Sequence, residues 1–283
     1  TWQAGRDMWA GIEDRESVRA IQAALDAGIT TIDTAAVYGK GHSEQIVARA
    51  VKGLRPEVVL ATKVFANDLA PERVAAACHR SLRNLQTDYI DLYQIHWPAG
   101  SFGTKAVPIE ETMAALTRLK AEGKIRAIGV SNFSRDQLAA ALACREVVSL
   151  QPPYSLFWRQ VEADAAPLCR EQGLSILAYS PMAQGLLTGK IGPGHAFAPG
   201  DHRSAHRLLQ PEHFARVQAA LEALRPLAAR HGATLGQLAL AWVLAQPNTC
   251  AIAGARSAEQ VRENARAADI RLSPADLEEM DRI

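Results

Sequence analysis

The feature that most constrains the fold is a regular alternation of short β-type runs with longer helical patterns along the whole chain. Nearly continuous apolar runs such as VVLAT, IDLYQIH and ILAYS are typical of parallel strands that are covered on both faces. Gly28, Gly123 and Gly173 end helical patterns just before the next strand. The β-type runs cover 30–35, 58–63, 90–97, 127–132, 149–154, 175–181 and 250–255. The helical patterns between them cover 16–27, 43–54, 72–85, 109–122, 135–144, 161–172 and 235–246.

This even alternation has no Pro/Gly/Ser-rich linker, and it predicts a (β/α)8 TIM barrel in which residues 1–283 form a single domain. A doubly wound sheet is the alternative, but about 250 residues is the usual size of a barrel. We expect a truncated first strand, with Thr1 and Trp2 near its carboxyl end. Residues 185–210 are expected to form a long insertion after the seventh strand, followed by an extra helix at 211–231.

Composition excludes several classes of function. A net charge of +1 with 22% charged residues argues against a nucleic-acid-binding protein and against a surface that binds anionic membranes. No apolar run reaches the ~18 residues that indicate a membrane span. The four cysteines, Cys78, Cys144, Cys169 and Cys250, are widely spaced and indicate a reducing compartment, so we expect a cytoplasmic protein.

Polar side chains stand where the predicted strands end, which is where a barrel of this kind carries its chemistry. Asp33, Lys63 and His96 close three consecutive strands, and Tyr38 follows the first of them. Further along the chain, Ser131, Asn132 and Gln151 stand at two more strand ends.

Each of these residues alone has an ordinary structural explanation, but ionisable groups are costly in apolar runs unless they are paired. We expect Asp33 and Lys63 to pair. The ammonium of Lys63 would then lower the pKa of Tyr38 from its usual value of about 10 and make it a better proton donor. His96 would orient a carbonyl oxygen, and the alternative is that His96 itself is the proton donor.

Asp33, Tyr38, Lys63 and His96, in that order on successive strands, resemble the catalytic tetrad of the aldo-keto reductases. DTAAVYGKGHSE resembles the family's segment around the acid and the tyrosine, and GVSNFS its nicotinamide-contact strand. YSPMAQGLLTGK resembles its pyrophosphate-binding loop, and GARSAEQVRENA its motif for the adenine end. The loop YSPMAQGLLTGK is most similar to bacterial members and to the β-subunits of potassium channels.

The resemblance implies that NADP(H) binds in an extended form across the rim of the barrel, and no GxGxxG follows a strand here. It implies that Ser131, Asn132 and Gln151 hold the nicotinamide carboxamide and that Tyr179 stacks on the ring. It further implies a pyrophosphate channel lined by Ser180, Gly185, Leu187, Lys190 and Arg203. At the adenosine end it implies Gly254, Arg256, Gln260, Glu263 and Asn264, with Arg256 favouring a 2′-phosphate and therefore NADPH over NADH. A capped surface helix, with Ser257 as its cap, is the structural alternative for this last motif.

The chain departs from the family's pattern at two places. Ala253 stands where relatives usually have proline, which loosens the turn before Gly254. The N-terminal hairpin and the first strand are missing or truncated, which leaves open whether Trp2 contacts the nicotinamide. Channel β-subunits tend to lack the tetrad histidine, so His96 favours a working reductase.

Histidines and aromatic residues suggest further sites. His195, His202, His206 and His213 crowd the long insertion, but without an acid or cysteine in ligand register we expect no metal. The candidate apolar wall of a substrate pocket consists of Trp9, Phe65, Trp97 and Phe157, and it favours an aromatic or otherwise apolar aldehyde.

The function predicted from the sequence is NADPH-dependent reduction of aldehydes and ketones, with a small carbonyl compound as the substrate and with neither nucleic acid nor a membrane as a partner. Two alternatives stay open. One is a cofactor-binding regulatory subunit that reports redox state with little turnover. The other is a barrel isomerase or lyase that uses Lys63 as a Schiff-base amine.

Overall fold

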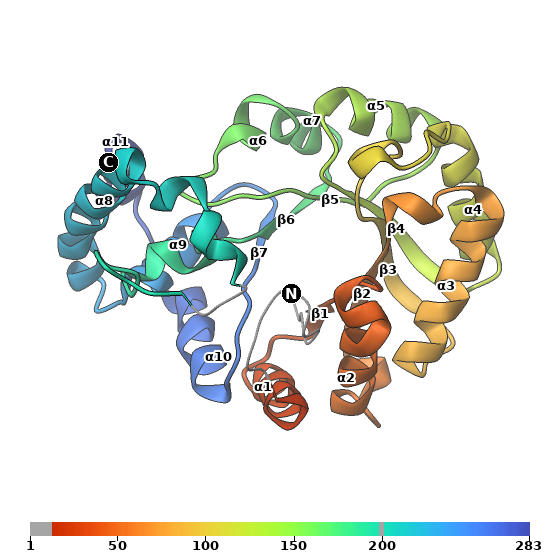
Figure 1. The fold of residues 1–283 in the computed structure, drawn as a ribbon, viewed down its shortest axis with the longest axis horizontal. Coiled ribbons are helices and arrows are strands. Elements are labelled where there is room, and N and C mark those ends of the chain that lie inside the picture. The colour runs from red at the N-terminus through yellow and green to blue at the C-terminus, as the bar shows by residue number, and fades with distance from the viewer. Residues whose placement is uncertain (1–12, 198–200) are drawn as a thin grey trace.

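The computed structural model describes residues 13–197 and 201–283, and it contains one parallel sheet of seven strands in the order β1 to β7. The strands curve into a nearly closed barrel that is surrounded by helices (Figure 1). The predicted barrel fold is therefore confirmed, whereas the expected first strand with Thr1 and Trp2 lies outside the described residues. The strands are β1 Thr31–Asp33, β2 Val59–Val64, β3 Ile90–Ile95, β4 Ile125–Ser131, β5 Ser149–Gln151, β6 Ser175–Tyr179 and β7 Thr249–Ile252. The helices are α1 Asp14–Asp26, α2 His42–Ala50, α3 Pro71–Leu85, α4 Ile109–Ala121, α5 Arg135–Cys144, α6 Gln160–Ala163, α7 Ala166–Glu171, α8 Pro211–Arg230, α9 Leu235–Leu244, α10 Ala258–Ala265 and α11 Pro274–Arg282.

The middle of the sheet is buried on both faces, which explains why these strands lack the alternating pattern of a half-exposed sheet. In β2 every residue after Val59 is buried, and β3 is buried except at the intermediate Asp91. Each strand is connected to the next by a helix on the outside, so all the carboxyl ends lie at the same rim of the barrel.

Three of the outer helices begin with a capping box, in which the cap and the third helical residue satisfy each other's backbone N–H groups. Ser134 caps α5, Thr234 caps α9 and Ser273 caps α11. Helix α11 was not predicted from the sequence, although the segment SPAD at its start carries this signal. Arg230 at the end of α8 forms ion pairs with Asp276 and Glu279, and these hold α11 beside α8.

The two ends of the sheet are covered by a helix pair. Among the described residues, β1 and β7 are the end strands, and α1 packs against α10 beside them (Figure 1). Ala20, Ala23 and Ala24 on α1 bury their small side chains against Val261 on α10. Small side chains let the two helices approach closely.

One predicted helix is divided. The sequence predicted a continuous helix over 161–172, but the structure has α6 and α7, which are separated at Asp164 and Ala165. Pro167 has no N–H to donate to the carbonyl of Ala163, so a continuous helix would lose that hydrogen bond. Asp164 Oδ1 instead accepts from the backbone N–H of Arg135 at 3.1 Å, which ties the break to the start of α5.

The predicted insertion after β6 contains short 3-10 turns, including Ala183–Thr188 and Arg207–Leu209, and it leads into α8. The described part of the chain contains no helix that is both long enough and apolar enough to cross a membrane.

Candidate active site

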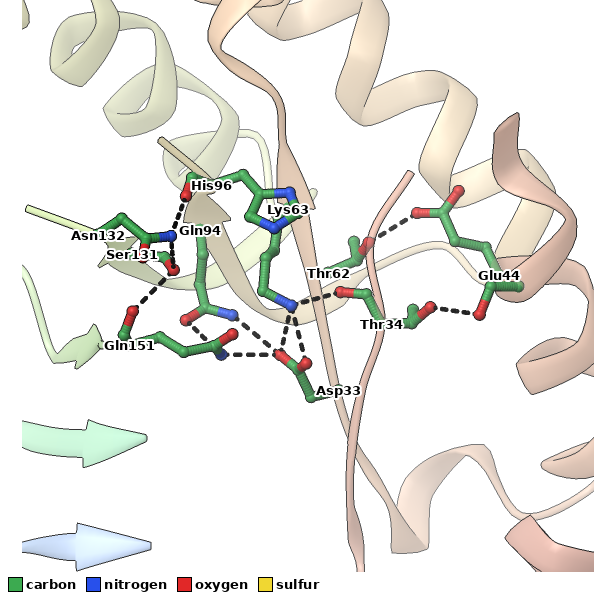
Figure 2. Close-up of polar contacts among 11 residues, drawn as sticks. Asp33, Thr34, Glu44, Thr62, Lys63, Gln94, His96, Ser131, Asn132 and Gln151 are labelled. Carbon is green, nitrogen blue, oxygen red and sulfur yellow. Dashed lines mark hydrogen bonds and ion pairs between the residues drawn. The ribbon is translucent and has the colours of Figure 1, made fainter. Parts of the chain in front are cut away.

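The carboxyl ends of β1, β2 and β3 bring three ionisable side chains together. Asp33 ends β1, Lys63 lies one residue before the end of β2, and His96 directly follows β3. All three are almost fully buried, with exposed fractions of 4%, 0% and 9%. The parallel register of β1, β2 and β3 brings the three side chains to one rim of the barrel. Figure 2 shows them grouped there, as the sequence predicted.

Lys63 and Asp33 form a buried ion pair. Lys63 Nζ donates to both carboxylate oxygens of Asp33 and to the backbone carbonyl of Thr34, each at 2.8 Å (Figure 2). Burial raises the pKa of Asp33, but the ammonium of Lys63 and hydrogen bonds from Lys63 and Gln151 outweigh this and bring the pKa below its usual value of 3.8. The carboxylate of Asp33 therefore remains ionised although it is buried.

Tyr38 begins a short 3-10 turn, Tyr38–Gly41, in the loop after β1. The Lys63 Nζ atom lies 5.6 Å from the centroid of the Tyr38 ring. The ring also meets His96 edge-on, with centroids 5.8 Å apart. Gly41 ends the turn at φ 95°, and a Cβ atom there would lie 2.4 Å from Asn84 Nδ2, so only glycine fits.

His96 is neutral at physiological pH. Burial, and then the nearby charge of Lys63, lower its pKa to about 3, although Asp33 acts in the opposite direction. Its Nδ1 atom is buried and has no hydrogen-bond partner among the described residues. A neutral imidazole has one N–H donor, so His96 can present one hydrogen bond to an oxygen in the site.

The next strands supply a connected set of hydroxyl and amide groups. Ser131 Oγ donates to the Gln151 carbonyl at 2.8 Å, and Asn132 Nδ2 donates to Ser131 Oγ and to the His96 carbonyl, both at 3.0 Å. Tyr179 OH donates to Asn132 Oδ1 at 2.9 Å. Burial, and then the neighbouring Tyr38, raise the pKa of Tyr179 to about 12, so this hydroxyl stays protonated. The structure thus brings these four predicted residues together beside His96.

The loop after β6 and the insertion supply the next predicted residues. Ser180 at φ 52° and Gly185 at φ 99° turn this loop, and a Cβ atom on Gly185 would lie 3.8 Å from Arg203 Nη1. Arg203 forms an ion pair with Asp201 at 2.6 Å, and Lys190 lies on the exposed side of the loop. The side chain of Leu187 is buried in the hydrophobic core.

The residues predicted for the adenosine end lie just before α10 and along it. Arg256 donates its backbone N–H to Gln260 Oε1 at 2.8 Å, and Asn264 Nδ2 lies 3.4 Å from the Gly254 carbonyl. Glu263 pairs with Lys190 at 3.8 Å, which connects α10 to the loop after β6. Ser257 caps the helix by accepting from the Gln260 N–H, as the structural alternative also predicted.

Aromatic rings stand next to His96. Phe65 meets the His96 ring edge-on at 5.8 Å and stacks on Phe102 at 5.7 Å, and Phe102 meets Trp97 at 5.0 Å. Phe102, which is 68% exposed, was not predicted as part of this wall. Phe157 forms no ring contact with these three in the described part of the chain, and Trp9 lies outside the described residues.

Two buried polar residues were also missed. Gln94 is fully buried in β3 and lies beside Asp33 and Gln151. Glu44 is fully buried on α2 and accepts from Thr62 Oγ1 at 2.7 Å and from Asn84 Nδ2 at 2.9 Å. Gln94 could have been found as a polar residue inside an apolar run. Glu44 could have been found as the last residue of the segment DTAAVYGKGHSE, which resembles the family's segment around the acid and the tyrosine.

The described residues contain no group of three or more His, Cys, Asp or Glu side chains that could hold a metal ion. Of the histidines in the insertion, His206 meets Trp158 in a tilted ring contact with centroids 5.3 Å apart, and His195 meets Phe197 edge-on with centroids 4.8 Å apart. The side chain of His202 is outside the described part.

Comparisons with known proteins identify a family and several solved relatives of the same fold. The profile of the aldo/keto reductase family matches residues 1–283. An NADH-specific methylglyoxal reductase of Escherichia coli (strain K12) is 40% identical over 98% of this chain and 90% of its own length. The solved glycerol dehydrogenase AKR11B4 of Gluconobacter oxydans has a TM-score of 0.91 and 36% identity, and the match covers 100% of this chain and 89% of that one. An aldo-keto reductase of Klebsiella pneumoniae solved in complex with NADPH has a TM-score of 0.78 and 34% identity, over 98% and 88% of the two chains.

Proposed function

The chain belongs to the aldo/keto reductase family of oxidoreductases, and on that premise we propose that it reduces aldehydes and ketones to alcohols with NADPH, Tyr38 giving the proton to the carbonyl oxygen. The observation that carries this proposal is the buried Asp33–Lys63 ion pair, whose ammonium lies 5.6 Å from the centroid of the Tyr38 ring. A fixed positive charge beside a phenol stabilises the phenolate that forms when the proton leaves.

The side chains beside His96 fit the nicotinamide end of such a cofactor. A primary carboxamide needs both hydrogen-bond donors and acceptors, and Ser131, Asn132 and Gln151 offer hydroxyl and amide groups of both kinds. The ring of Tyr179, held by its hydrogen bond to Asn132, offers a flat face for stacking. When it is bound, the reduced nicotinamide supplies the hydride for the carbonyl carbon.

The phosphate end is supported by cationic side chains. Lys190 and Arg203 lie on the loop after β6 and on the insertion, where a pyrophosphate would be held by charge. Arg256 precedes the first turn of α10, and its guanidinium can contact a 2′-phosphate in bidentate fashion. This supports NADPH, while the relative that is NADH-specific makes NADH the alternative to be tested.

In the proposed reaction Lys63 stabilises the ionised form of Tyr38, and Asp33 holds the Lys63 ammonium in place. All three N–H donors of the Lys63 ammonium are used by Asp33 and by the Thr34 carbonyl. This arrangement argues against the Schiff-base alternative, because a Schiff base requires a neutral amine with a free lone pair. His96 donates one hydrogen bond to the carbonyl oxygen and orients it toward Tyr38.

The pKa of His96 supports Tyr38 rather than His96 as the proton donor. With a pKa of about 3, His96 carries no exchangeable imidazolium proton at pH 7. Its remaining N–H is much less acidic than the phenol of Tyr38, but it serves well as a hydrogen-bond donor.

The rings of Phe65, Trp97 and Phe102 support an apolar or aromatic aldehyde as the substrate. They are continuous with His96 through Phe65, so the apolar part of a substrate would pack on them while its oxygen meets His96 and Tyr38. Methylglyoxal, the substrate named for the Escherichia coli relative, is the small, polar aldehyde against which an apolar aldehyde can be compared.

The test is cofactor oxidation, followed by the loss of absorbance at 340 nm, with benzaldehyde and with methylglyoxal, each with NADPH and with NADH. We expect turnover with both aldehydes, a higher kcat/KM for benzaldehyde and a preference for NADPH. Tight NADPH binding without turnover on any carbonyl would contradict the reductase and support the redox-reporting subunit instead. A preference for NADH would overturn the choice of NADPH and the role of Arg256, but not the reductase activity.

A further inference from the structure

One carboxylate and two amide side chains from alternate strands meet in one layer inside the barrel. Asp33 from β1, Gln94 from β3 and Gln151 from β5 are exposed by 4%, 0% and 2%. Gln151 Nε2 donates to Asp33 Oδ1 at 2.9 Å, and Gln94 Nε2 donates to the same oxygen at 3.3 Å (Figure 2). Residues of alternate strands form the layers that fill a barrel of this type, so the grouping follows from the fold.

Space for this contact is provided by a glycine on the strand between. The register of β3 and β4 places Gln94 opposite Gly129. A Cβ atom at position 129 would lie 2.9 Å from Gln94 Cγ and 2.5 Å from Ser149 Oγ. The missing side chain therefore lets Gln94 extend across β4 and reach Gln151 on β5.

The carboxylate of Asp33 fixes which way both amides point. An ionised carboxylate only accepts hydrogen bonds, so Gln94 and Gln151 must each present an N–H group to it. Gln94 Oε1 then faces Gln151 Nε2, at 3.3 Å, and accepts a second hydrogen bond from that amide. No donor among the described residues reaches Gln151 Oε1, so this oxygen is the atom left to accept an amide N–H from a ligand.

We propose that Gln94 is a positioning residue that links the Asp33–Lys63 ion pair to the carboxamide-binding residue Gln151, holding the Gln151 amide with its oxygen toward the cofactor. This rests on the proposed function, because it assigns Gln151 to the nicotinamide carboxamide. Without Gln94, the Gln151 amide loses one of its two fixed acceptors and is free to rotate away from Asp33. Cofactor binding then has to order that amide, which lowers the affinity.

The experiment measures NADPH binding by titration calorimetry and turnover in parallel, for wild type, Gln94→Met and the control Leu92→Met. Met has nearly the length and volume of Gln but cannot form these hydrogen bonds, and Leu92 lies two residues earlier on the same strand against the same glycine. We expect Gln94→Met to raise the NADPH Kd about tenfold, the factor that corresponds to one buried hydrogen bond. We expect Leu92→Met to change it less than twofold, with a smaller effect of either substitution on kcat. Should Gln94→Met fail to fold, Gln94→Leu fills the same space and carries the same expectation.

A double-variant cycle separates positioning from a general effect on the fold. If Gln94 acts through Gln151, adding Gln94→Met to a Gln151→Met protein changes the NADPH Kd less than threefold. An NADPH Kd within twofold of wild type in Gln94→Met would overturn the proposal, and so would a full tenfold effect that persists in Gln151→Met. Wild-type protein that binds neither NADPH nor NADH would overturn the proposed function as well, so the two failures are distinguishable.

Discussion

The buried neutral His96 makes the stability of the protein depend on pH in a way that can be calculated. Its pKa is about 3 in the folded state against 6.5 for the ordinary side chain, because burial and the charge of Lys63 disfavour the imidazolium. Between these two values the unfolded chain binds a proton that the folded protein does not bind. The contribution of His96 to stability is therefore fully present above pH 6.5 and is lost as the pH falls toward 3.

The magnitude follows from about 1.36 kcal/mol for each unit of pKa difference. From pH 7 to pH 6 the expected loss is about 0.7 kcal/mol, and from pH 7 to pH 5 it is about 2 kcal/mol. His96→Gln removes the titrating group and keeps a polar side chain there. Urea unfolding of both proteins at pH 7, 6 and 5 gives the difference between their free energies of unfolding at each pH. The contributions of the other histidines are the same in both proteins and cancel in this difference. Wild type and variant with the same pH dependence would refute the reasoning, because His96 would then titrate equally in both states.

Three further outcomes follow from the same contacts. Lys63→Met leaves the Asp33 carboxylate buried without its partner and should lower the free energy of unfolding in urea by about 3–5 kcal/mol. Adding Asp33→Asn should recover part of that loss, and a double variant whose loss equals the sum of the two single losses would contradict this. Arg256→Ala should raise the Kd for NADPH about tenfold and leave the Kd for NADH within twofold, because Arg256 contacts the 2′-phosphate, which NADH lacks. Calorimetry measures both constants, and an equal loss of affinity for both cofactors would count against the assignment. Gly129→Ala places a Cβ atom 2.5 Å from Ser149 Oγ and should cost about 1–3 kcal/mol, while the control Gly192→Ala, whose Cβ meets nothing within 4 Å, should be neutral in the same unfolding assay.

Much of the fold could be predicted from local patterns in the sequence. Continuous apolar runs and helix stop signals predicted each of the seven strands, and a polar residue at the end of a strand predicted Asp33, Lys63 and His96. These features are local, because a parallel strand that is buried on both faces is apolar at nearly every position.

The parts that the sequence did not predict depend on contacts between distant residues. Gln94 is one polar residue in the run IDLYQIH, and its importance appears only when the register places Gly129 opposite it. Glu44 acquires its partners Thr62 and Asn84 only when α2 packs against β2 and α3. Phe102 joins Phe65 and Trp97 through a loop whose path no periodic pattern indicates.

The central claim is that Tyr38, tuned by Lys63, gives the proton to the carbonyl oxygen, and the most direct test is Tyr38→Phe measured in steady-state aldehyde reduction together with its NADPH Kd. The account predicts that kcat falls by about 100-fold or more while the Kd stays within twofold of wild type, because the phenol acts on the reacting oxygen and not on the cofactor. A Tyr38→Phe protein that retains most of its turnover would contradict the account and assign the proton to His96.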